Sequence, residues 1–512
     1  MLHGPVFSAG CFVNTPFSTP YTLCVGSIAR LYTVAVSLPD QVLAIARAVR
    51  DEAGRALLVG GCVRDDLMGQ QPKDWDLEIY GIAPARLREI LDRFGSVNVV
   101  GEAFTVYKLG ADFDVSLPRR ELKTGRGHRA FFIEGDPSMS IEEATKRRDF
   151  TINAILQDAL TLEIIDPFGG RKDLDAKSLR AVSPKTFPED SLRVLRAAQF
   201  AARFEFEIDP ETVALCRSID VTDLPAERIW GEMEKLLLRA QRPSIGLKWL
   251  RELSAVDQLF PELKALIDVP QEPEWHPEGD VWIHTLLTVD RARELIDDLP
   301  YPKQVTVMLA ALCHDFGKPA TTEFVDGRIR SREHEEEGVP PTESFLGRLN
   351  IHTLDGYDVR GQVIALVRDH LKPGEFYKKR DEVGDGAFRR LARKCELDLL
   401  YRVAKADSLG RNADWVPREN WYDAAAQEWF IERVRELDVG SQAPAPMLLG
   451  RHLLEMGMQP GPRMGDITKA IYEMQLDGRV TSLDEASAAA KKMLSADYPE
   501  SAGKTERETE PA

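Results

Sequence analysis

Two aspartates in the first fifth of the chain have a spacing that suits metal chemistry. Asp74 and Asp76 are separated by one residue in KDWDLEIY, a segment with the apolar pattern of a strand. Alternate residues of a strand point to the same face, so both carboxylates share one face. Paired carboxylates repel each other unless a cation lies between them. Two Mg²⁺ ions about 3.5–4 Å apart would satisfy this pair, as in nucleotidyl transfer.

A glycine pair and a third carboxylate complete this first constellation. Gly60 and Gly61 separate a short apolar strand, residues 56–59, from a helical segment that begins at Cys62. Backbone N–H groups at such a helix start can hold phosphate oxygens. Asp114, in a later strand-like segment, is the candidate third carboxylate. The competing interpretation is that DWD is a solvated turn. The glycine pair and helix start that precede DWD in the sequence disfavour it.

Basic residues follow the candidate carboxylates. Between Arg119 and Arg148, eight Lys and Arg stand against five Asp and Glu. The stretch TGRGHR predicts a mobile loop that could close over a triphosphate or a primer end, with a solvated charged loop as the alternative. In FPEDSLRVLRAAQFAARF, Asp190 and Arg193 lie about one helical turn apart and could address the Watson–Crick edge of a base. A salt-bridged helix face is the other explanation of this spacing.

A second constellation of histidines and aspartates lies in the second half of the chain. His284 occurs in DVWIHTLL, and the adjacent pair His314-Asp315 ends an apolar run in AALCHDFGKP. The later members of the series are His334, His370 and Asp407. Neutral imidazoles and carboxylates are the ligands of hydrolytic divalent sites, where the ion makes water a nucleophile near neutral pH. A lone histidine is usually packed or solvated, but this ordered series in a helical segment favours a metal site.

The elements that must position these residues divide the chain into an α+β part and a mainly helical part. Asp40 is the expected N-cap of a first helix that Gly54 ends, and residues 77–80, 104–109 and 113–117 have strand patterns. After about residue 175, long amphipathic stretches predict helices at 191–204, 226–239, 245–253, 284–295, 305–312, 359–368, 385–408 and 421–437. The expected divisions are a disordered extension 1–37, a head 38–178, a helical neck 179–268, a third domain 269–412, a helical tail 413–495 and a disordered end 496–512.

Composition bounds the class of protein. The chain has 512 residues, 43% hydrophobic and 29% charged, with a formal charge of −17. A general nucleic-acid coat protein is excluded by this charge, so an RNA partner requires a local basic surface. Six cysteines without a CxxC pair indicate reduced thiols, and no apolar run reaches the about 18 residues of a membrane span. A cytoplasmic protein with no membrane partner is expected.

Four motifs of the first half together resemble those of bacterial tRNA nucleotidyltransferases, the CCA-adding enzymes, and their poly(A) polymerase relatives. The motifs are LVGGCVRD with KDWDLEIYG, RRDFTINAI, DPFGGRKDL and EDSLRVLRAAQFAARF. The resemblance implies a polymerase-β-like head with a mixed sheet and a helical neck, with Mg²⁺ on Asp74 and Asp76. It further implies that Gly60, Gly61 and Arg64 hold the triphosphate. The remaining implied nucleotide contacts are Arg148, Asp149, Asn153, Glu189, Asp190, Arg193 and Arg196.

The segment from Glu274 to Asn412 resembles the HD phosphohydrolase domain and its counterpart in the multifunctional subgroup of bacterial CCA enzymes. The resemblance implies a first divalent ion, a transition metal or Mg²⁺, on His284, His314, Asp315 and Asp407. His334 and His370 could complete a second metal position, and Lys318 could contact a phosphate. The implied reactions are those of a 2′,3′-cyclic phosphodiesterase, a 2′-nucleotidase and a phosphatase.

We therefore expect an enzyme that builds or repairs the 3′-terminal CCA of tRNA from CTP and ATP, fused to a metal-dependent phosphohydrolase, and we expect no DNA partner. A poly(A) polymerase, or an enzyme that adds only CC or only A, would carry the same motifs. A hydrolase whose head merely binds RNA is an alternative of another class. A non-enzymatic RNA-binding protein is disfavoured by the intact sets of carboxylates and histidines.

Overall fold

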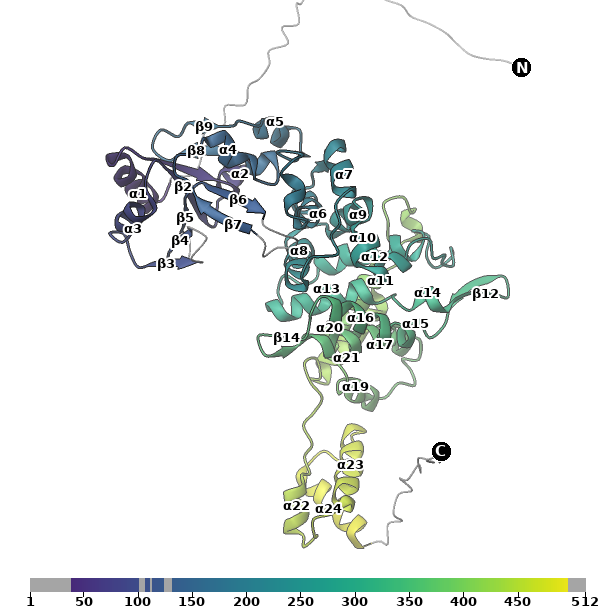
Figure 1. The fold of residues 1–512 in the computed structure, drawn as a ribbon. Coiled ribbons are helices and arrows are strands. Elements are labelled where there is room, and N and C mark those ends of the chain that lie inside the picture. Colours follow the sequence, from purple (N-terminus) through teal and green to yellow (C-terminus); the bar gives the residue numbers. More distant parts are fainter. Residues whose placement is uncertain (1–37, 101–105, 111–112, 124–130, 496–512) are drawn as a thin grey trace, which may run out of the picture.

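The computed structural model describes residues 38–100, 106–110, 113–123 and 131–495. Figure 1 shows a head with a sheet, a long helical middle part and a small helical unit at the end of an extended segment. The expected disordered segments 1–37 and 496–512, and the glycine-rich loop TGRGHR, lie outside the described residues. Within the described part, no helix is long and apolar enough to cross a membrane.

The head is built on a seven-stranded mixed sheet in the order β3-β4-β5-β2-β1-β8-β9. Only β2 and β5 pair in parallel, and the other neighbours are antiparallel. The strands are β1 (Arg55–Val59), β2 (Trp75–Tyr80), β3 (Val97–Val100), β4 (Val106–Leu109), β5 (Phe113–Ser116), β8 (Leu156–Asp158) and β9 (Ile164–Ile165). The expected α+β head with a mixed sheet is confirmed.

Five α-helices belong to the described part of the head, and two details of the sequence prediction are wrong. The helices are α1 (Asp40–Asp51), α2 (Gly61–Leu67), α3 (Pro84–Leu91), α4 (Ile141–Lys146) and α5 (Gly170–Asp175), and α1 packs against β1 and α3. Asp40 is the first helical residue and Pro39 takes the cap position without a side-chain hydrogen bond. Asp74 lies one residue before β2, because that strand begins with the buried Trp75.

The neck stacks three helices, α6 (Leu192–Phe204), α8 (Ala226–Arg239) and α9 (Pro243–Glu252), close to the predicted ranges. Phe150 of the head packs edge-on against Phe187 and Phe200, with ring centroids 5.6 and 5.8 Å apart. The apolar core of the neck runs on without interruption into the following domain. Head, neck and third domain therefore meet through buried apolar surface, which favours a defined arrangement.

The third domain is mainly helical, as expected, and its principal helices are α12 (Val281–Arg293), α13 (Tyr301–Cys313), α15 (His334–Glu337), α17 (Val359–Asp369) and α20 (Leu397–Gly410). The single helix predicted over 385–408 is wrong, since α19 (Asp385–Leu391) ends before α20 begins. At the break, the carboxylate of Glu396 accepts hydrogen bonds from Lys303 at 2.6 Å and Tyr357 at 2.7 Å. These partners are distant in sequence, so helical periodicity could not reveal the break.

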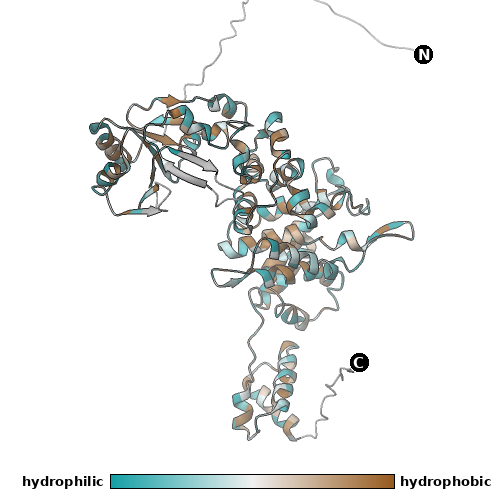
Figure 2. Ribbon diagram, in the orientation of Figure 1, coloured by the Kyte–Doolittle hydropathy of each residue, from teal (hydrophilic) through white to brown (hydrophobic). Residues whose placement is uncertain are grey.

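Two hairpins of the third domain were also missed. One, β12 (Thr322–Val325) with β13 (Arg328–Ser331), projects from the body in Figure 1, and the other pairs β14 (Thr353–Leu354) with β15 (Tyr357–Asp358). The terminal unit has its own small core, formed by α22 (Gly450–Glu455), α23 (Pro462–Leu476) and α24 (Leu483–Ser495). Figure 2 shows apolar and polar residues interspersed along these helices, and the buried apolar ones include Leu453, Ile471 and Ala490, one from each helix. Arg390 and Arg393 of the α19 region bind Glu473 of α23 at 2.9 and 3.0 Å.

Candidate active sites

The first candidate site lies where the parallel strands β2 and β5 run side by side. Asp76 and Asp114 are direct partners in this register, so their carboxylates leave the sheet next to each other. Burial, with the nearby Asp114 and Asp74 carboxylates, raises the pKa of Asp76 above its ordinary value although Arg148 opposes the shift. A carboxylate that resists ionisation among other carboxylates fits a site for divalent cations. Sequence reasoning missed Lys108 of β4, whose amine lies 2.9 Å from Asp114.

The glycine turn brings backbone close to these carboxylates. Gly60 has φ +73°, and a Cβ there would lie 3.1 Å from the guanidinium of Arg148 and 3.9 Å from the carboxylate of Asp76. Arg148 also lies 3.7 Å from Glu78, a buried acid that is two residues beyond Asp76 on β2 and accepts a hydrogen bond from Tyr80 at 2.6 Å. The arginine is thus placed between the glycine turn and β2, where it can hold phosphate charge.

Four of the expected nucleotide contacts form one connected network at the junction of head and neck. Arg64 is almost fully buried and donates to Asn153 at 2.5 Å. Asn153 donates to Asp149 at 3.0 Å, and Asp149 accepts two hydrogen bonds from Arg196, at 2.6 and 2.9 Å. Burial opposes the ionisation of Asp149, but the charge of Arg196 and the hydrogen bond from Asn153 outweigh it and lower its pKa.

The expected base-reading pair is engaged with other protein groups. Asp190 accepts a hydrogen bond from Arg228 of α8 at 2.9 Å. Arg193 is 8% exposed and donates to the carbonyl oxygens of Thr186 and Arg147, at 2.7 and 2.5 Å. Both side chains would have to exchange these partners to contact a base. Arg228 was missed because it lies in a different helix. Glu189 ends a short 3₁₀ helix directly before Asp190.

The second candidate site gathers the six predicted histidines and aspartates into one buried cluster of the third domain. Three of the histidines share one arrangement, in which Nδ1 faces the backbone carbonyl three residues earlier. The distances are 2.8 Å from His314 to Ala311, 2.8 Å from His334 to Ser331 and 2.6 Å from His370 to Val367. A carbonyl can only accept, so Nδ1 carries the proton and Nε2 keeps its lone pair for a metal.

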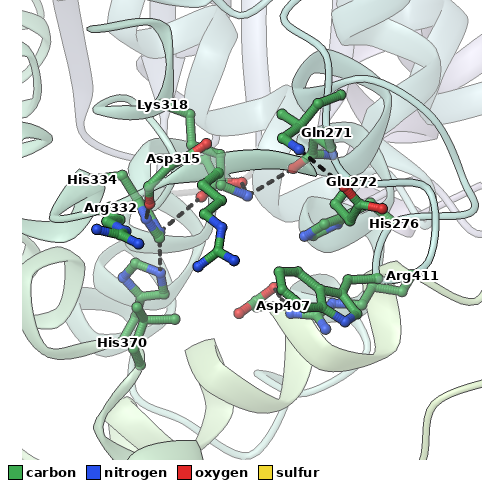
Figure 3. Close-up of a pocket in the computed structure, with 15 residues that line it drawn as sticks. Gln271, Glu272, His276, Asp315, Lys318, Arg332, His334, His370, Asp407 and Arg411 are labelled. Atoms are coloured by element: carbon green, nitrogen blue, oxygen red, sulfur yellow. Dashed lines mark hydrogen bonds and ion pairs between the residues drawn. The ribbon is translucent and has the colours of Figure 1, made fainter. Parts of the chain in front are cut away.

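Asp315 lies between two groups of histidine nitrogens. Its Oδ2 is 3.2 Å from Nε2 of His314 and 3.8 Å from Nε2 of His284, while its Oδ1 is 3.5 Å from Nε2 of His334. His334 in turn faces His370, with 3.3 Å between their Nε2 atoms. Each of the two groups could hold a metal ion, and Asp315 belongs to both. Figure 3 shows His334, His370 and Asp315 converging in this way.

The imidazole nitrogens and carboxylate oxygens of the cluster are the kinds of atom that bind divalent ions. Nε2 of His314 is buried and has no hydrogen-bond partner among the described residues. Burial, with the neighbouring His334 and His314 rings, lowers the pKa of His370 to about 3, so its imidazole is neutral near pH 7. Burial opposes the ionisation of Asp315, but His314 and Lys318 outweigh it and hold its pKa well below the ordinary range. His370 as a neutral imidazole and Asp315 as an ionised carboxylate are in the forms that metals bind. Burial disfavours the charged form of His284, but Asp407 and Glu278 outweigh burial and raise its pKa.

Two residues that sequence reasoning did not place in the site lie behind His284. The fully buried Glu278 lies 2.7 Å from Nδ1 of His284 and 2.9 Å from Nδ1 of His276. Nε2 of His284 is thereby left to face Asp407, 3.1 Å away. A carboxylate behind a ligand histidine fixes its tautomer and its orientation. The sequence signal for these two residues is the segment WHPEGD, residues 275–280, which places a histidine and a glutamate directly before the helix of His284.

The cluster opens into a cavity of about 280 Å³, whose lining carries four Lys or Arg side chains and the three carboxylates of Glu272, Asp315 and Asp407. Lys318 lies 2.7 Å from Asp315 and also donates to Gln271 at 2.7 Å (Figure 3). The other cationic residues of the lining are Arg330, Arg332 and Arg411. Arg330 lies in β13 and Arg332 directly follows that strand, so the hairpin that sequence reasoning missed and the residue after it supply two of these four cations. A phosphate group beside the metal cluster would find donors on several sides.

Comparisons with known proteins agree with this architecture. Residues 56–180 match the model of the poly A polymerase head domain, 205–267 that of a probable RNA and SrmB-binding site of polymerase A, and 281–412 that of the HD domain. The multifunctional CCA protein of Xanthomonas campestris pv. campestris (strain B100) is 38% identical over 80% of this chain and 95% of its own. That of Xylella fastidiosa (strain M12) is 37% identical over 70% of this chain and 84% of its own.

Solved structures share the fold at lower identity. The Bacillus stearothermophilus CCA-adding enzyme in complex with CTP aligns with a TM-score of 0.59 at 20% identity, covering 89% of this chain and 97% of that chain. The Thermotoga maritima CCA-adding enzyme complexed with tRNA_CCA gives 0.55 at 18% identity, with coverages of 89% and 94%. The relatives above share more than a third of their residues with this chain along most of their length, and the chain belongs to the family of multifunctional CCA proteins.

Proposed function

We propose that this protein adds or repairs the 3′-terminal CCA of tRNA from CTP and ATP in its head and neck, and hydrolyses phosphoesters at the metal cluster of its HD domain. The observation that carries the first activity is the parallel register that sets Asp76 beside Asp114. The names of the relatives and the CTP, ATP and tRNA in the solved complexes of related fold support the substrates.

In the head, the RNA 3′-hydroxyl would attack the α-phosphate of the bound nucleotide, and pyrophosphate would leave. Asp74, Asp76 and Asp114 would hold Mg²⁺, which neutralises developing charge on the phosphate oxygens when bound. Gly60 and Gly61 offer backbone N–H groups to the triphosphate. Arg64 and Arg148 supply the adjacent positive charge.

Base selection is assigned to the neck. Asp190 has acceptors and Arg193 has donors, a pair that fits cytosine and adenine better than guanine or uracil. Asp149 and Asn153 would contact the ribose and phosphates, and Arg196 would keep Asp149 ionised and oriented. Glu189 begins the motif, and its backbone sets the position of Asp190. Release of Asp190 from Arg228 would accompany nucleotide binding.

In the HD domain, the residues divide into metal ligands and phosphate contacts. His284, His314, Asp315 and Asp407 would hold one divalent ion, and His334 and His370, with Asp315, a second. A divalent ion in such a site activates water for attack on phosphorus when bound. Lys318 and the arginines of the cavity would bind the phosphate, and the burial of the cluster excludes bulk water from the ligands.

The proposal also covers the domain boundaries of the chain and the cellular compartment in which the protein acts. We assign residues 38–178 to the head, 179–268 to the neck, 269–412 to the HD domain and 413–495 to the tail. The described cysteines Cys62, Cys216, Cys313 and Cys395 are all free and buried. Free thiols support action in the reducing cytoplasm.

The test separates the two activities on full-length protein. Incubation with tRNA that lacks its 3′ end and each labelled nucleotide should incorporate C, C and A in order, whereas long runs of A would show a poly(A) polymerase and C or A alone a partial enzyme. Asp76→Ala should abolish addition and keep phosphatase activity. His314→Ala with Asp315→Ala should do the reverse, and unaltered hydrolysis in that variant would exclude the HD site.

A further inference from the structure

A second large cavity lies at the joint between neck and HD domain, away from both candidate active sites. Its volume is about 620 Å³, and none of the proposed metal ligands lines it. Three segments form its walls: the α9 region, one side of α12, and residues 412–415 directly after α20. Figure 1 shows α9 and α12 next to each other at this joint.

The α9 wall carries positive charge that the protein compensates only in part. Burial raises the pKa of Asp290, a carboxylate of the same lining, and the nearby Arg242 and Lys248 oppose that shift. Arg242, Lys248 and Arg251 are exposed and make no ion pair and no side-chain hydrogen bond within the described part of the chain. Two carboxylates of the lining are occupied instead. Asp290 accepts hydrogen bonds from the N–H and hydroxyl of Ser244 at 2.8 and 2.6 Å, and Glu294 pairs with Arg291 at 3.0 Å. Asp414 adds one further carboxylate. The cationic wall is therefore available to an anionic ligand.

The opposite wall presents an aromatic face. Trp415 is 61% exposed, yet its indole N–H donates to the backbone oxygen of Glu278 at 3.2 Å. This hydrogen bond anchors the ring in a loop while leaving its surface open. Trp282 of α12 adds a buried aromatic side chain to the same lining. An anchored, exposed indole offers a stacking platform to a nucleobase, since every base has a π-face.

We propose that this cavity binds a nucleotide unit, with its phosphate on Arg242, Lys248 and Arg251 and its base on Trp415. The volume suits such a ligand, because small-molecule pockets span about 300–1,000 Å³. The unit could be a free nucleotide or one nucleotide of a bound RNA strand, which share this chemistry. The site goes beyond the proposed function, since its residues belong to neither reaction centre. Its three cationic residues lie within the RNA-binding family match, residues 205–267, whereas α12 and Trp415 lie outside that match.

The walls of the cavity also carry ligands of the HD cluster on their other sides. α12 contributes His284, and α20, which precedes the Trp415 loop, contributes Asp407; the two side chains face each other at 3.1 Å. Trp415 is bonded to Glu278, which in turn contacts His284. Occupancy of the cavity should therefore stabilise the backbone segments that hold these ligands.

The test measures binding to the full-length protein in two arms: 5′-AMP by calorimetry and tRNA lacking its 3′ CCA by fluorescence anisotropy. Lys248→Glu and Trp415→Ala should each weaken binding about tenfold in at least one arm, and the arm that responds identifies the source of the nucleotide. Lys264→Glu is the matched charge control, because Lys264 is an exposed neck residue outside the cavity. Trp415→Phe keeps an aromatic face, and both controls should bind within about twofold of wild type.

Three outcomes would overturn the proposal. The first is that Lys248→Glu binds both 5′-AMP and tRNA as tightly as the wild type, and the second is that the Trp415→Ala variant does so. The third is that Lys248→Glu and Lys264→Glu weaken binding equally. If Trp415→Ala lowers the folded fraction, the binding site is tested instead by hydrogen exchange of the wild-type protein with and without ligand. The ligand should then protect residues 281–291 and 412–416, and absence of protection in both segments would contradict the site. None of these readouts depends on nucleotide addition or hydrolysis, so they stand apart from the proposed function.

Discussion

Replacement of Glu278 by glutamine should release the metal from the HD cluster while leaving the fold largely intact. Glu278 is fully buried and faces Nδ1 of His284 at 2.7 Å and Nδ1 of His276 at 2.9 Å. Burial opposes its ionisation, but its hydrogen bonds with His276 and His284 outweigh burial and lower its pKa to about 2. It is therefore a carboxylate across the working pH range, and both rings can donate to it.

The size of the effect follows from what glutamine cannot supply. Both Nδ1 atoms face the same oxygen, Oε1, while Oε2 is buried and has no hydrogen-bond partner among the described residues. Glutamine would present a neutral amide oxygen to the two rings and an NH₂ group at the position of Oε2, so both rings lose their ionised partner. Loss of such a partner behind a ligand histidine costs about 10–100-fold in metal affinity or activity. A buried donor without an acceptor also costs about 1–3 kcal/mol of folding free energy. The metal effect should exceed the stability effect, because His284 loses the negative charge behind it and keeps only a neutral acceptor.

The assay is titration of full-length protein with Co²⁺ or Ni²⁺, followed by calorimetry and by metal analysis after desalting. Glu272→Gln is the matched control, because Glu272 lines the same cavity but accepts from the backbone of Ile329 and contacts no ligand. The control should bind metal within about twofold of wild type. Metal affinity of Glu278→Gln within about threefold of wild type, in folded protein, would refute the orienting role of Glu278. Nucleotide addition should be unaffected in both variants.

Three further predictions concern separate parts of the molecule. Asp114→Asn should reduce CCA addition by more than about 100-fold, since even an outer partner of a ligand costs about 10–100-fold, with hydrolysis as the unaffected internal control; near-normal addition would remove Asp114 from the site. Gly317→Ala places a Cβ 2.0 Å from the carbonyl oxygen of His334, so α15 must shift. We expect a loss of about 1–3 kcal/mol in thermal unfolding and less bound metal, and an unchanged melting temperature would contradict the packing argument. Asp149→Asn removes the ion pair with Arg196 and should cost about 1–3 kcal/mol in urea unfolding at pH 7, and a constant cost at all pH values would be inconsistent with an ionised Asp149. Because the folded pKa of Asp149 lies below its ordinary 3.8, this cost is full above that value and declines as the pH falls through the folded pKa.

Local spacing was enough to predict several features of the head and the HD cluster. Strand patterns predicted β1, β2, β4 and β5 but not β3, β8 or β9, and the glycine pair before Cys62 predicted the start of α2. The order of histidines and aspartates predicted a cluster, and all six side chains lie in it. The strands and the start of α2 depend on residues within one or two turns of each other, where the geometry of a helix or strand determines which face a side chain occupies. The cluster was predicted from residue types and their order over residues 284–407, together with the resemblance to the HD domain.

Features that depend on pairing between distant segments could not be predicted in the same way. The break before α20 follows from buried partners of Glu396 on other elements, and the β12–β13 hairpin brings arginines to a cavity formed by helices. The hydrogen bonds of Arg193 also depend on tertiary structure, because their acceptors are two backbone carbonyls from other segments. No periodicity in the chain encodes these contacts.

The sequence by itself determined which residue types could hold phosphate and metal, and in which order they occur. Only the tertiary structure decided their partners: Asp114 beside Asp76 through a parallel register, Asp315 between two pairs of histidines, and Glu278 behind His284. The reason is physical. Side-chain chemistry and local periodicity belong to short segments, whereas register and packing are settled by which distant apolar faces bury one another.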